Sequence, residues 1–322
     1  MNVEKGFVDQ PVDATLDLKA EILRLKREKG AVILAHYYQP GEIQDIADHI
    51  GDSLALAQYA ATLDDARIIV LCGVHFMGET AKVLCPDKKV LIPDLNAGCS
   101  LADSCPAGEF AKFVEAHPGY TVISYVNTSI GVKALTDVLV TSGNAKKIVD
   151  TFPADAKLIF GPDRNLGNYI NSTTGRNMVL WDGACHVHER FSVEKIAALK
   201  AAHPGAKVLA HPECKRPVLL MADVVGSTAV LLKYAIESED KEFIVATESG
   251  ILHQMQKSCP DKTFIAVPPV DSTCGCNDCS YMKLNTLEKL YNCLKYEQPE
   301  IKVDPELAAR ARRPIERMLQ LS

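Results

Sequence analysis

Short apolar runs alternate with stretches of helical spacing along most of the chain. Runs such as AVILA (31–35), RIIVL (67–71) and KVLIP (89–93) have the length of buried strands, and stretches that mix charged and apolar residues separate them. The alternation continues through YTVIS (120–124) to TFIAVPP (263–269). Strands that alternate with helices in this way are typical of parallel sheets, so the pattern predicts an α/β fold.

The first and last segments of this pattern are predicted to be helical. Residues 16–29 (LDLKAEILRLKREK) place apolar residues at helical spacing among charges, and Gly30 ends this helix. The tail from about residue 284 to 321 also has helical spacing. We expect Pro299 and Pro314 to break or start helices there, and we expect the tail to pack back onto the body.

One plan recurs in each third of the chain. The first strand of each third leads into a polar residue, and these residues, His36, Tyr125 and His211, lie 89 and 86 positions apart. A serine follows them after 17, 17 and 16 positions, at Ser53, Ser142 and Ser227. Any α/β protein has strands at short intervals, but chance does not readily place matched serines. A period of this length is too long for a solenoid and fits small βα domains.

The repeat predicts three similar small αβα domains with parallel sheets, arranged around a pseudo-threefold axis. The predicted boundaries are 1–103, which includes the N-terminal helix, 104–190 and 191–284, followed by a helical tail at 285–322 that packs on the body. Ligands of open parallel sheets bind at the carboxyl ends of the strands. The strand ends of all three domains are therefore expected to point inward and to share one site.

Composition and charge exclude several classes of protein. With 47% hydrophobic and 24% charged residues, the chain is typical of a globular protein and not of a disordered one. A net charge of −6 offers no basic surface to nucleic acid. No apolar run approaches the roughly 18 residues of a membrane span, and the first residues carry acids where a signal peptide needs an apolar segment. We expect a cytoplasmic protein that binds neither nucleic acid nor membranes.

Eleven cysteines add thiol chemistry to this picture. Their odd number and a reducing cytoplasm disfavour a framework of disulfides. Cys274, Cys276 and Cys279 fall within six residues, which core packing alone does not explain. In the first two thirds, Cys99 and Cys185 follow the polar first-strand residue by 63 and 60 positions; in the last third, Cys274 does so by 63 and Cys279 by 68. One cysteine from each third is expected to reach the common centre.

Sequence reasoning leaves the chemistry of three converging thiols open. Thiolates suit a soft metal or an iron–sulfur cluster, and a 4Fe–4S cluster held by three of them leaves one iron open as a Lewis acid. Zinc competes, although the chain has no second CxxC and no nearby histidine pair to complete four ligands. A redox-active thiol pair is the third alternative. The cysteines in or beside apolar stretches are predicted to be buried small hydrophobes: Cys72, Cys85, Cys105, Cys214, Cys259 and Cys293.

The other polar residues at strand and helix ends favour a small anionic ligand. Hydroxyls, imidazoles and an amide beside helix N-termini bind carboxylates or phosphates without net positive charge. Glu213 is the natural general base of the set, and Tyr38 and Tyr125 can donate or relay protons. The full set is His36, Tyr38, Ser53, Tyr125, Asn127, Ser142, His188, His211, Glu213, Ser227 and Thr228.

Short motifs spread over nearly the whole chain give these residues a context. They are HYYQ at 36, GDSL at 51, CGVHFMGET at 72, AGCSLAD at 97, YVNTS at 125, GPDRNLG at 161, GACHVH at 183, HPEC at 211, GST at 226, ATESG at 246 and CSYMKLNTLE at 279. Together they resemble the quinolinate synthase family. The resemblance implies a 4Fe–4S cluster with three cysteine ligands and one open iron. It also implies condensation of iminoaspartate with dihydroxyacetone phosphate to quinolinate, with loss of phosphate and water, in NAD biosynthesis.

The resemblance assigns roles to individual residues of this chain. The cluster ligands fall on Cys99, Cys185 and Cys279, the last chosen by its CxxM context although equal spacing favours Cys274. The implied iminoaspartate contacts are His36, Ser53, Tyr125, Asn127, Ser142, His211, Glu213 and Thr228. The implied phosphate contacts or proton relays are Tyr38, His188 and Ser227. The predicted catalytic residues are Glu213, Tyr38, His211 and Tyr125.

Two departures and two rival functions accompany the resemblance. Many relatives have a cysteine where this chain has Val140, which removes a thiol without touching a ligand, and Cys274 and Cys276 are additional to the three ligands. An iron–sulfur redox sensor or electron carrier without turnover is the alternative function, and a zinc hydrolase is a third. A transient contact with an enzyme that produces iminoaspartate is also expected, because iminoaspartate hydrolyses in water.

Overall fold

The computed structural model of the chain describes residues 3–270 and 277–322. Within these residues it contains three four-stranded sheets, and every pair of neighbouring strands is parallel. The strand orders are β2-β1-β3-β4, β6-β5-β7-β8 and β10-β9-β11-β12, so the three sheets repeat one topology. The predicted α/β fold with three similar parallel-sheet units is confirmed.

Helices and strands alternate in the same order in each unit. The first contains α1 (Leu18–Lys29), β1 (Ala31–His36), α2 (Gly41–Gln44), β2 (His49–Gly51), α3 (Ser53–Ala61), β3 (Ile68–Cys72), α4 (His75–Leu84), β4 (Lys89–Leu91) and α5 (Ser100–Asp103). The second contains α6 (Ala107–Glu115), β5 (Thr121–Tyr125), α7 (Ile130–Lys133), β6 (Val138–Val140), α8 (Ala145–Asp150), β7 (Leu158–Gly161), α9 (Arg164–Thr174), β8 (Val179–Leu180) and the 3-10 helix η1 (His188–Arg190). The third contains α10 (Val193–Ala202), β9 (Lys207–Ala210), α11 (Arg216–Leu219), β10 (Val224–Val225), α12 (Thr228–Glu237), β11 (Glu242–Ala246), α13 (Ile251–Ser258), β12 (Thr263–Ala266) and the 3-10 helix η2 (Met282–Leu284). The tail forms α14 (Leu287–Tyr296) and α15 (Pro305–Leu321).

The second strand of each unit, β2, β6 or β10, is only two or three residues long and is absent from the predicted runs. An aspartate precedes each of these strands. The carboxylates of Asp48, Asp137 and Asp223 accept hydrogen bonds of 2.8, 2.8 and 2.7 Å from backbone N–H groups of β1, β5 and β9. The same side-chain bond therefore fastens the short strand to the first strand in all three units.

Neighbouring side chains of β1 point to opposite faces of the first sheet. Ile33 and Ala35 belong to a core that α1 and α14 line, whereas Leu34 belongs to a core that α3 and α4 line. None of the three side chains is exposed. Burial of both faces between helices explains why this strand is a continuous apolar run in the sequence and does not alternate with polar residues.

The N-terminal helix α1 is two residues shorter than predicted. It begins at Leu18 because Asp17 caps it, and the Asp17 carboxylate accepts a hydrogen bond of 3.1 Å from the N–H of Ala20. Gly30 ends the helix as predicted, in the left-handed conformation with φ 59°. The apolar stripe of α1 places Ile22 and Leu25 in the core.

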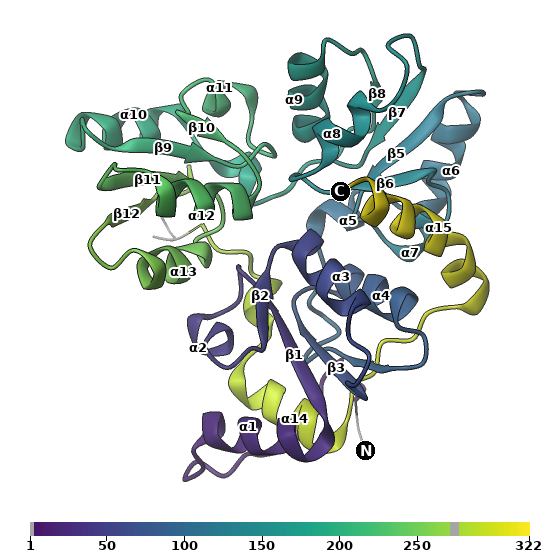
Figure 1. Cartoon of the computed structure of the whole chain (residues 1–322), viewed down its shortest axis with the longest axis vertical. Helices are drawn as coiled ribbons and strands as arrows, with labels where there is room; N and C mark the ends of the chain where they lie inside the picture. The colour runs from purple at the N-terminus through teal and green to yellow at the C-terminus, as the bar shows by residue number, and fades with distance from the viewer. Residues whose placement is uncertain (1–2, 271–276) are drawn as a thin grey trace.

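The tail packs onto the body as predicted, but one prediction about its prolines is wrong. α14 packs against α1, and α15 packs against α4, α7 and β6 (Figure 1). Pro299 lies in the segment between these helices, whereas Pro314 lies inside α15 and does not break it. A proline inside a helix costs about 3 kcal/mol. The burial of Ala311, Ile315 and Met318 on the same helix offsets that cost.

The three units surround a common central region, with the first at the bottom of the view and the third at the left (Figure 1). Each predicted domain range, 1–103, 104–190 and 191–284, contains one sheet. The boundaries themselves and the pseudo-threefold axis stay predictions. In the part of the chain that the structure describes, no helix has both the length and the apolar character needed to cross a membrane.

Candidate active site

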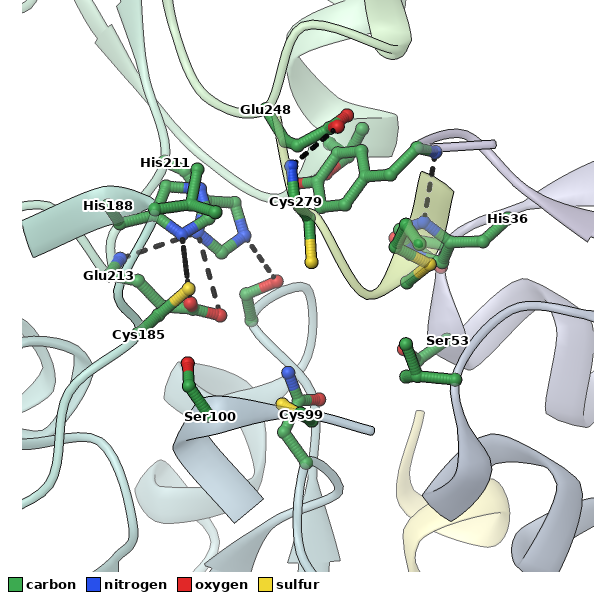
Figure 2. A pocket seen from close by; sticks show the side chains of 18 of the residues that line it. His36, Ser53, Cys99, Ser100, Cys185, His188, His211, Glu213, Glu248 and Cys279 are labelled. Carbon is green, nitrogen blue, oxygen red and sulfur yellow. Dashed lines mark hydrogen bonds and ion pairs between the residues drawn. The ribbon is translucent and has the colours of Figure 1, made fainter. Parts of the chain in front are cut away.

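A cavity of about 700 Å³ is lined by residues from all three units (Figure 2). The predicted site residues that line it are His36, Tyr38, Ser53, Cys99, Tyr125, Asn127, Ser142, Cys185, His188, His211, Glu213, Thr228 and Cys279. The topology thus brings together every predicted site residue except Ser227.

The first strand of each unit delivers one of these side chains. His36 ends β1, Tyr125 ends β5 and His211 directly follows β9. The carboxyl ends of parallel strands are where open α/β sheets bind ligands. The three side chains are buried, with at most 5% of each residue exposed, so they form a wall that bulk water does not reach.

Helix N-termini deliver the hydroxyl groups. Ser53 and Thr228 are the first residues of α3 and α12, and Ser142 lies shortly before α8. Free N–H groups and the positive end of the helix dipole favour anions at such positions. Ser227 does not line the cavity; it caps α12, and its Oγ accepts a hydrogen bond of 3.4 Å from the N–H of Val230. Its part in substrate binding stays a prediction.

Glu213 lies at the centre of a buried network of aromatic and imidazole groups. Tyr125 Oη donates a hydrogen bond of 2.6 Å to Glu213 Oε1, and His188 Nδ1 lies 3.0 Å from Oε2. The His188 ring stacks on the His211 ring with 4.6 Å between centroids. His188 Nε2 lies 3.0 Å from Thr247 Oγ1, which fixes the far side of the ring. Two rings and a phenol therefore hold the carboxylate in one orientation.

Burial and hydrogen bonding set the charge of this network. Burial by itself would raise the pKa of Glu213, but His188, His211 and the hydrogen bonds from His188 and Tyr125 outweigh it and lower the pKa to about 2. Burial lowers the pKa of His211 to about 3, although Glu213 partly opposes this. His211 Nδ1 accepts the N–H of Glu213 at 3.4 Å, so its Nε2 carries the hydrogen toward Ser142 Oγ at 3.1 Å. At neutral pH a carboxylate thus lies beside a neutral imidazole.

Tyr38 connects the first unit to the third. Its Oη lies 2.8 Å from Thr228 Oγ1 and 2.9 Å from Thr247 Oγ1, and burial raises its pKa well above the ordinary value. The His36 ring packs edge-on against it with 4.4 Å between centroids. Burial, and then the charge of Lys283, lowers the pKa of His36 to about 3. Both groups are uncharged at neutral pH and can donate hydrogen bonds to an anion.

The side chains of Cys99, Cys185 and Cys279 project into the same cavity from different units (Figure 2). All three are free thiols. Burial raises the pKa of Cys99 to about 12, and the charge of Cys279 adds to this; burial likewise raises the pKa of Cys185, with Glu213 and Cys99 adding to it. Neighbouring thiolates thus disfavour one another. A bound cation or metal cluster would relieve that repulsion, so the donor set fits a thiolate-bound metal centre.

Two buried carboxylates hold the cysteine loops by their backbones. Asp163 accepts the N–H of Cys185 at 3.3 Å, and Glu248 accepts the N–H of Cys279 at 3.1 Å. Both acids were missed as site residues. They lie 85 positions apart, each two residues after the third strand of its unit, which matches the spacing of 86 between Tyr125 and His211. The repeat could therefore have identified them.

One group of side chains offers a different metal site. Ligand atoms of Cys185, His188 and Glu213 all lie within 4.8 Å of one another. Thiolate, imidazole and carboxylate are the ligands of zinc as well as of other transition metals. This group overlaps the three-thiol set at Cys185, so only one arrangement can be occupied at a time.

Two buried polar atoms at the cavity lack a partner among the described residues. They are Thr141 Oγ1 and Asn127 Oδ1, and both residues line the cavity. Buried polar atoms are normally hydrogen-bonded, so an unpaired one at a cavity wall is a place for a ligand. Thr141 was missed because the repeat drew attention to the serine after it.

The remaining cysteines separate into two sets. The prediction of buried small hydrophobes is confirmed for Cys72, Cys85, Cys105, Cys214, Cys259 and Cys293, each at most 7% exposed. Cys274 and Cys276 lie outside the described residues. Of the three clustered cysteines, Cys279 is the one that the structure places at the cavity.

A wider cleft of about 1470 Å³ lies between α9 and α11. The described residues that line it are neutral or basic and include no cysteine, histidine or carboxylate. It therefore lacks the chemistry that the first cavity concentrates, and the first cavity is the candidate site.

Comparison with known proteins identifies the family of this chain. Residues 20–320 match the family described as quinolinate synthetase A protein. A protein named quinolinate synthase from Synechococcus sp. is 56% identical over 315 residues, which cover 98% of each chain. Proteins of the same name from Microcystis aeruginosa and Chloroherpeton thalassium are 58% and 55% identical, over 306 and 307 residues that cover 95% of this chain and 95% of each relative. The chain therefore belongs to the quinolinate synthetase A protein family.

Proposed function

We propose that this enzyme condenses iminoaspartate with dihydroxyacetone phosphate to give quinolinate, phosphate and two waters, as a step of NAD biosynthesis. Family membership supports the product, because the relatives are named quinolinate synthase. The observation that carries the proposal is the convergence of Cys99, Cys185 and Cys279 on the cavity that also holds Glu213 and its partners. The reaction loses phosphate and water and gains no electrons, so it calls for acid–base and Lewis-acid groups.

The proposed cofactor is a 4Fe–4S cluster held by Cys99, Cys185 and Cys279 with one iron open. When bound, it supplies a Lewis acid that takes up an oxygen or carboxylate of the reacting molecule and helps water to leave. The proposal is supported by three free thiols that project from different units into one cavity. Asp163 and Glu248 hold two of these loops in place through the backbone N–H groups of Cys185 and Cys279.

The anionic ends of the substrates are proposed to bind at the helix N-termini. Ser53 and Thr228 at the starts of α3 and α12, with Ser142 before α8, offer hydroxyls to carboxylates. Neutral His36 and the amide of Asn127 add further donors. His188 and Ser227 are the proposed phosphate-side residues, with Ser227 acting from its cap position outside the cavity lining.

Proton movement is proposed to run through Glu213 and the groups bonded to it. A carboxylate with a pKa of about 2 accepts protons weakly by itself at neutral pH. Tyr125 donates a hydrogen bond of 2.6 Å to Glu213, and His188 Nδ1 lies 3.0 Å from the same carboxylate. Both groups can pass protons, and the negative charge of Glu213 stabilises the protonated form of these partners. His211 and Tyr38 are the remaining proton carriers, and burial of the whole network excludes water from the reacting atoms.

The testing experiment combines metal analysis with an assay for quinolinate. Anaerobically purified protein should contain about four irons per chain, and Cys99→Ala, Cys185→Ala or Cys279→Ala should each remove the cluster absorption and the activity together. Cys276→Ala should keep both, as should the control Cys259→Ala, which changes a buried cysteine that does not line the cavity. An essential Cys276 beside a dispensable Cys279 would overturn the ligand assignment.

Two rival functions have specific readouts. The group of Cys185, His188 and Glu213 favours a single metal ion as a second candidate. About one zinc per chain with no iron would favour a zinc enzyme over the iron–sulfur proposal. An iron–sulfur sensor or electron carrier would hold its cluster and yet ignore small anions. An EPR signal that changes when a small dicarboxylate is added favours the enzyme instead.

We further propose that the enzyme works in the cytoplasm. The nine described cysteines are all free, which suits a reducing compartment. Iminoaspartate hydrolyses in water, so a transient contact with the enzyme that produces it is part of the proposal. The net charge of −6 argues against a nucleic-acid partner.

A further inference from the structure

Lys133, the last residue of α7, is a lysine with no exposed surface. Its Nζ donates a hydrogen bond to the carbonyl of Thr128 and lies 5.1 Å from the centroid of the Phe76 ring. Among the described residues no carboxylate oxygen lies within 4.0 Å of this ammonium. A buried cation is costly unless negative charge nearby offsets it, so its retention needs an explanation.

The hydrogen bond alone does not explain the charge. In the first unit, Gln44 occupies the position that Lys133 occupies in the second, eight residues after the end of the first strand. Its Nε2 donates to the carbonyl of Gln39 at 2.8 Å, and Gln39 corresponds to Thr128, three residues after the strand. A neutral amide therefore makes the same bond in the first unit. The second unit differs in carrying a full positive charge there.

The residues around Lys133 connect its positive charge to the cavity. Phe76, beneath the ammonium, lines the cavity, and so does Asn127, the neighbour of Thr128. Burial lowers the pKa of Lys133 to about 8, and the negative charges of Glu79 and Cys99 act against this. Glu79 offsets the charge of Lys133 only in part: its carboxylate accepts the N–H of Ile130 at 3.0 Å and makes no ion pair with Lys133 within 4.0 Å, and the pKa of Lys133 stays lowered.

We propose that Lys133 is the fixed positive charge that balances an anionic iron–sulfur centre at Cys99, an inference that rests on the proposed function. A 4Fe–4S cluster held by three thiolates is a net anion, and an ammonium one layer behind Phe76 lies in a medium that screens it poorly. The hydrogen bond of Lys133 goes to the Thr128 carbonyl and not to a cluster ligand, so Lys133 acts by electrostatics on the electron affinity of the cluster. The charge stabilises the more negative, reduced state of the centre.

The test is the reduction potential of the anaerobically prepared holoenzyme, measured by titration followed by EPR. Lys133→Gln keeps a donor for Thr128, as Gln44 does for Gln39, and removes the charge. We expect the reduction equilibrium constant to fall about tenfold, which is a shift of about 59 mV to more negative potential for a one-electron couple. Lys133→Arg should restore the wild-type potential, and Glu79→Gln should shift it in the opposite direction.

Lys262 provides a matched control in the third unit. It is also buried, donates to the carbonyls of Ala235 and Ser238, and lies 5.7 Å from the Phe243 ring, but none of these groups lines the cavity. Lys262→Gln should leave the potential unchanged. The inference is wrong if the reduction potential of Lys133→Gln equals that of wild type. It is also wrong if Lys133→Met shifts the potential and Lys133→Gln does not. Either result leaves the proposed function standing. Wild-type protein without any iron–sulfur centre would overturn both.

Discussion

The hydrogen bond between Tyr125 and Glu213 offers a direct measure of the charge in the cavity. Tyr125→Phe removes one atom, the Oη that donates to Glu213 Oε1 at 2.6 Å. Tyr125 is 5% exposed and Glu213 is 3% exposed, so water has little access to replace the lost donor. The perturbation is therefore confined to the contacts of this oxygen, which are with Glu213 and with the Ser142 side chain.

The size of the effect follows from the charge of the acceptor. A hydrogen bond to a charged group contributes about 1.5–3 kcal/mol, whereas a bond between neutral groups contributes about 1 kcal/mol. Because the lowered pKa of Glu213 keeps it ionised at neutral pH, we expect Tyr125→Phe to reduce the free energy of unfolding by about 2 kcal/mol. If the bond persists in the transition state, kcat/KM for quinolinate formation falls about 30-fold.

Tyr38→Phe is the matched control. It also removes one buried phenol oxygen, but the partners of that oxygen are the neutral hydroxyls of Thr228 and Thr247, at 2.8 and 2.9 Å. We expect a loss of about 1 kcal/mol in this variant. Urea denaturation of both variants and wild type, prepared identically under anaerobic conditions, compares the two losses. A Tyr125→Phe loss no larger than that of Tyr38→Phe would refute the reasoning that Glu213 is an ionised acceptor.

Three further perturbations test other parts of the structure. Thr141→Val should leave stability nearly unchanged, because the Thr141 hydroxyl has no partner among the described residues. It should raise KM several-fold if that hydroxyl binds substrate, and an unchanged KM would exclude the contact. Glu297→Gln should lower stability above about pH 4.5, and the loss should shrink as the pH falls toward 2. The reason is that hydrogen bonds from Lys89 and Lys29 lower the pKa of Glu297 from 4.5 to about 2. Thermal melts in which the difference from wild type does not depend on pH would contradict this. Asp137→Ala should lower the free energy of unfolding by about 1–2 kcal/mol through loss of its bond to the first strand of the second unit. Denaturation of the equally placed Asp48→Ala should show at least as large a loss, because Asp48 also pairs with Lys26 at 2.7 Å.

The longer strands were predictable because both faces of each sheet are buried. Runs such as residues 31–35 and 67–71 correspond to β1 and β3 with shifts of one residue at their ends. The short strands β2, β6 and β10 were not predictable from apolar runs, since they have only two or three residues. Their aspartates, at 48, 137 and 223, recur at regular spacing in the sequence, but only the tertiary structure shows that each carboxylate bonds to the first strand.

The prediction for Pro314 was wrong because it used only local sequence. A proline at position 314 argues locally for a helix end, yet it lies buried within α15. The packing of α15 onto α4, α7 and β6 joins segments far apart in the sequence, and no local rule includes that burial.

The sequence by itself determined the α/β class, the threefold repetition of the plan and a set of site residues of which all but Ser227 line the cavity. It could do so because strand periodicity and the positions after strand ends are local features, and a repeated fold places equivalent residues at equivalent spacing. The tertiary structure alone decided which groups touch. The pairing of Glu213 with Tyr125 and His188, the support of Cys185 by Asp163, and the location of Lys133 behind Phe76 all join separate strands and helices. Charge, burial and hydrogen-bond partners at this site are properties of tertiary contacts, within and between units, and local sequence does not contain them.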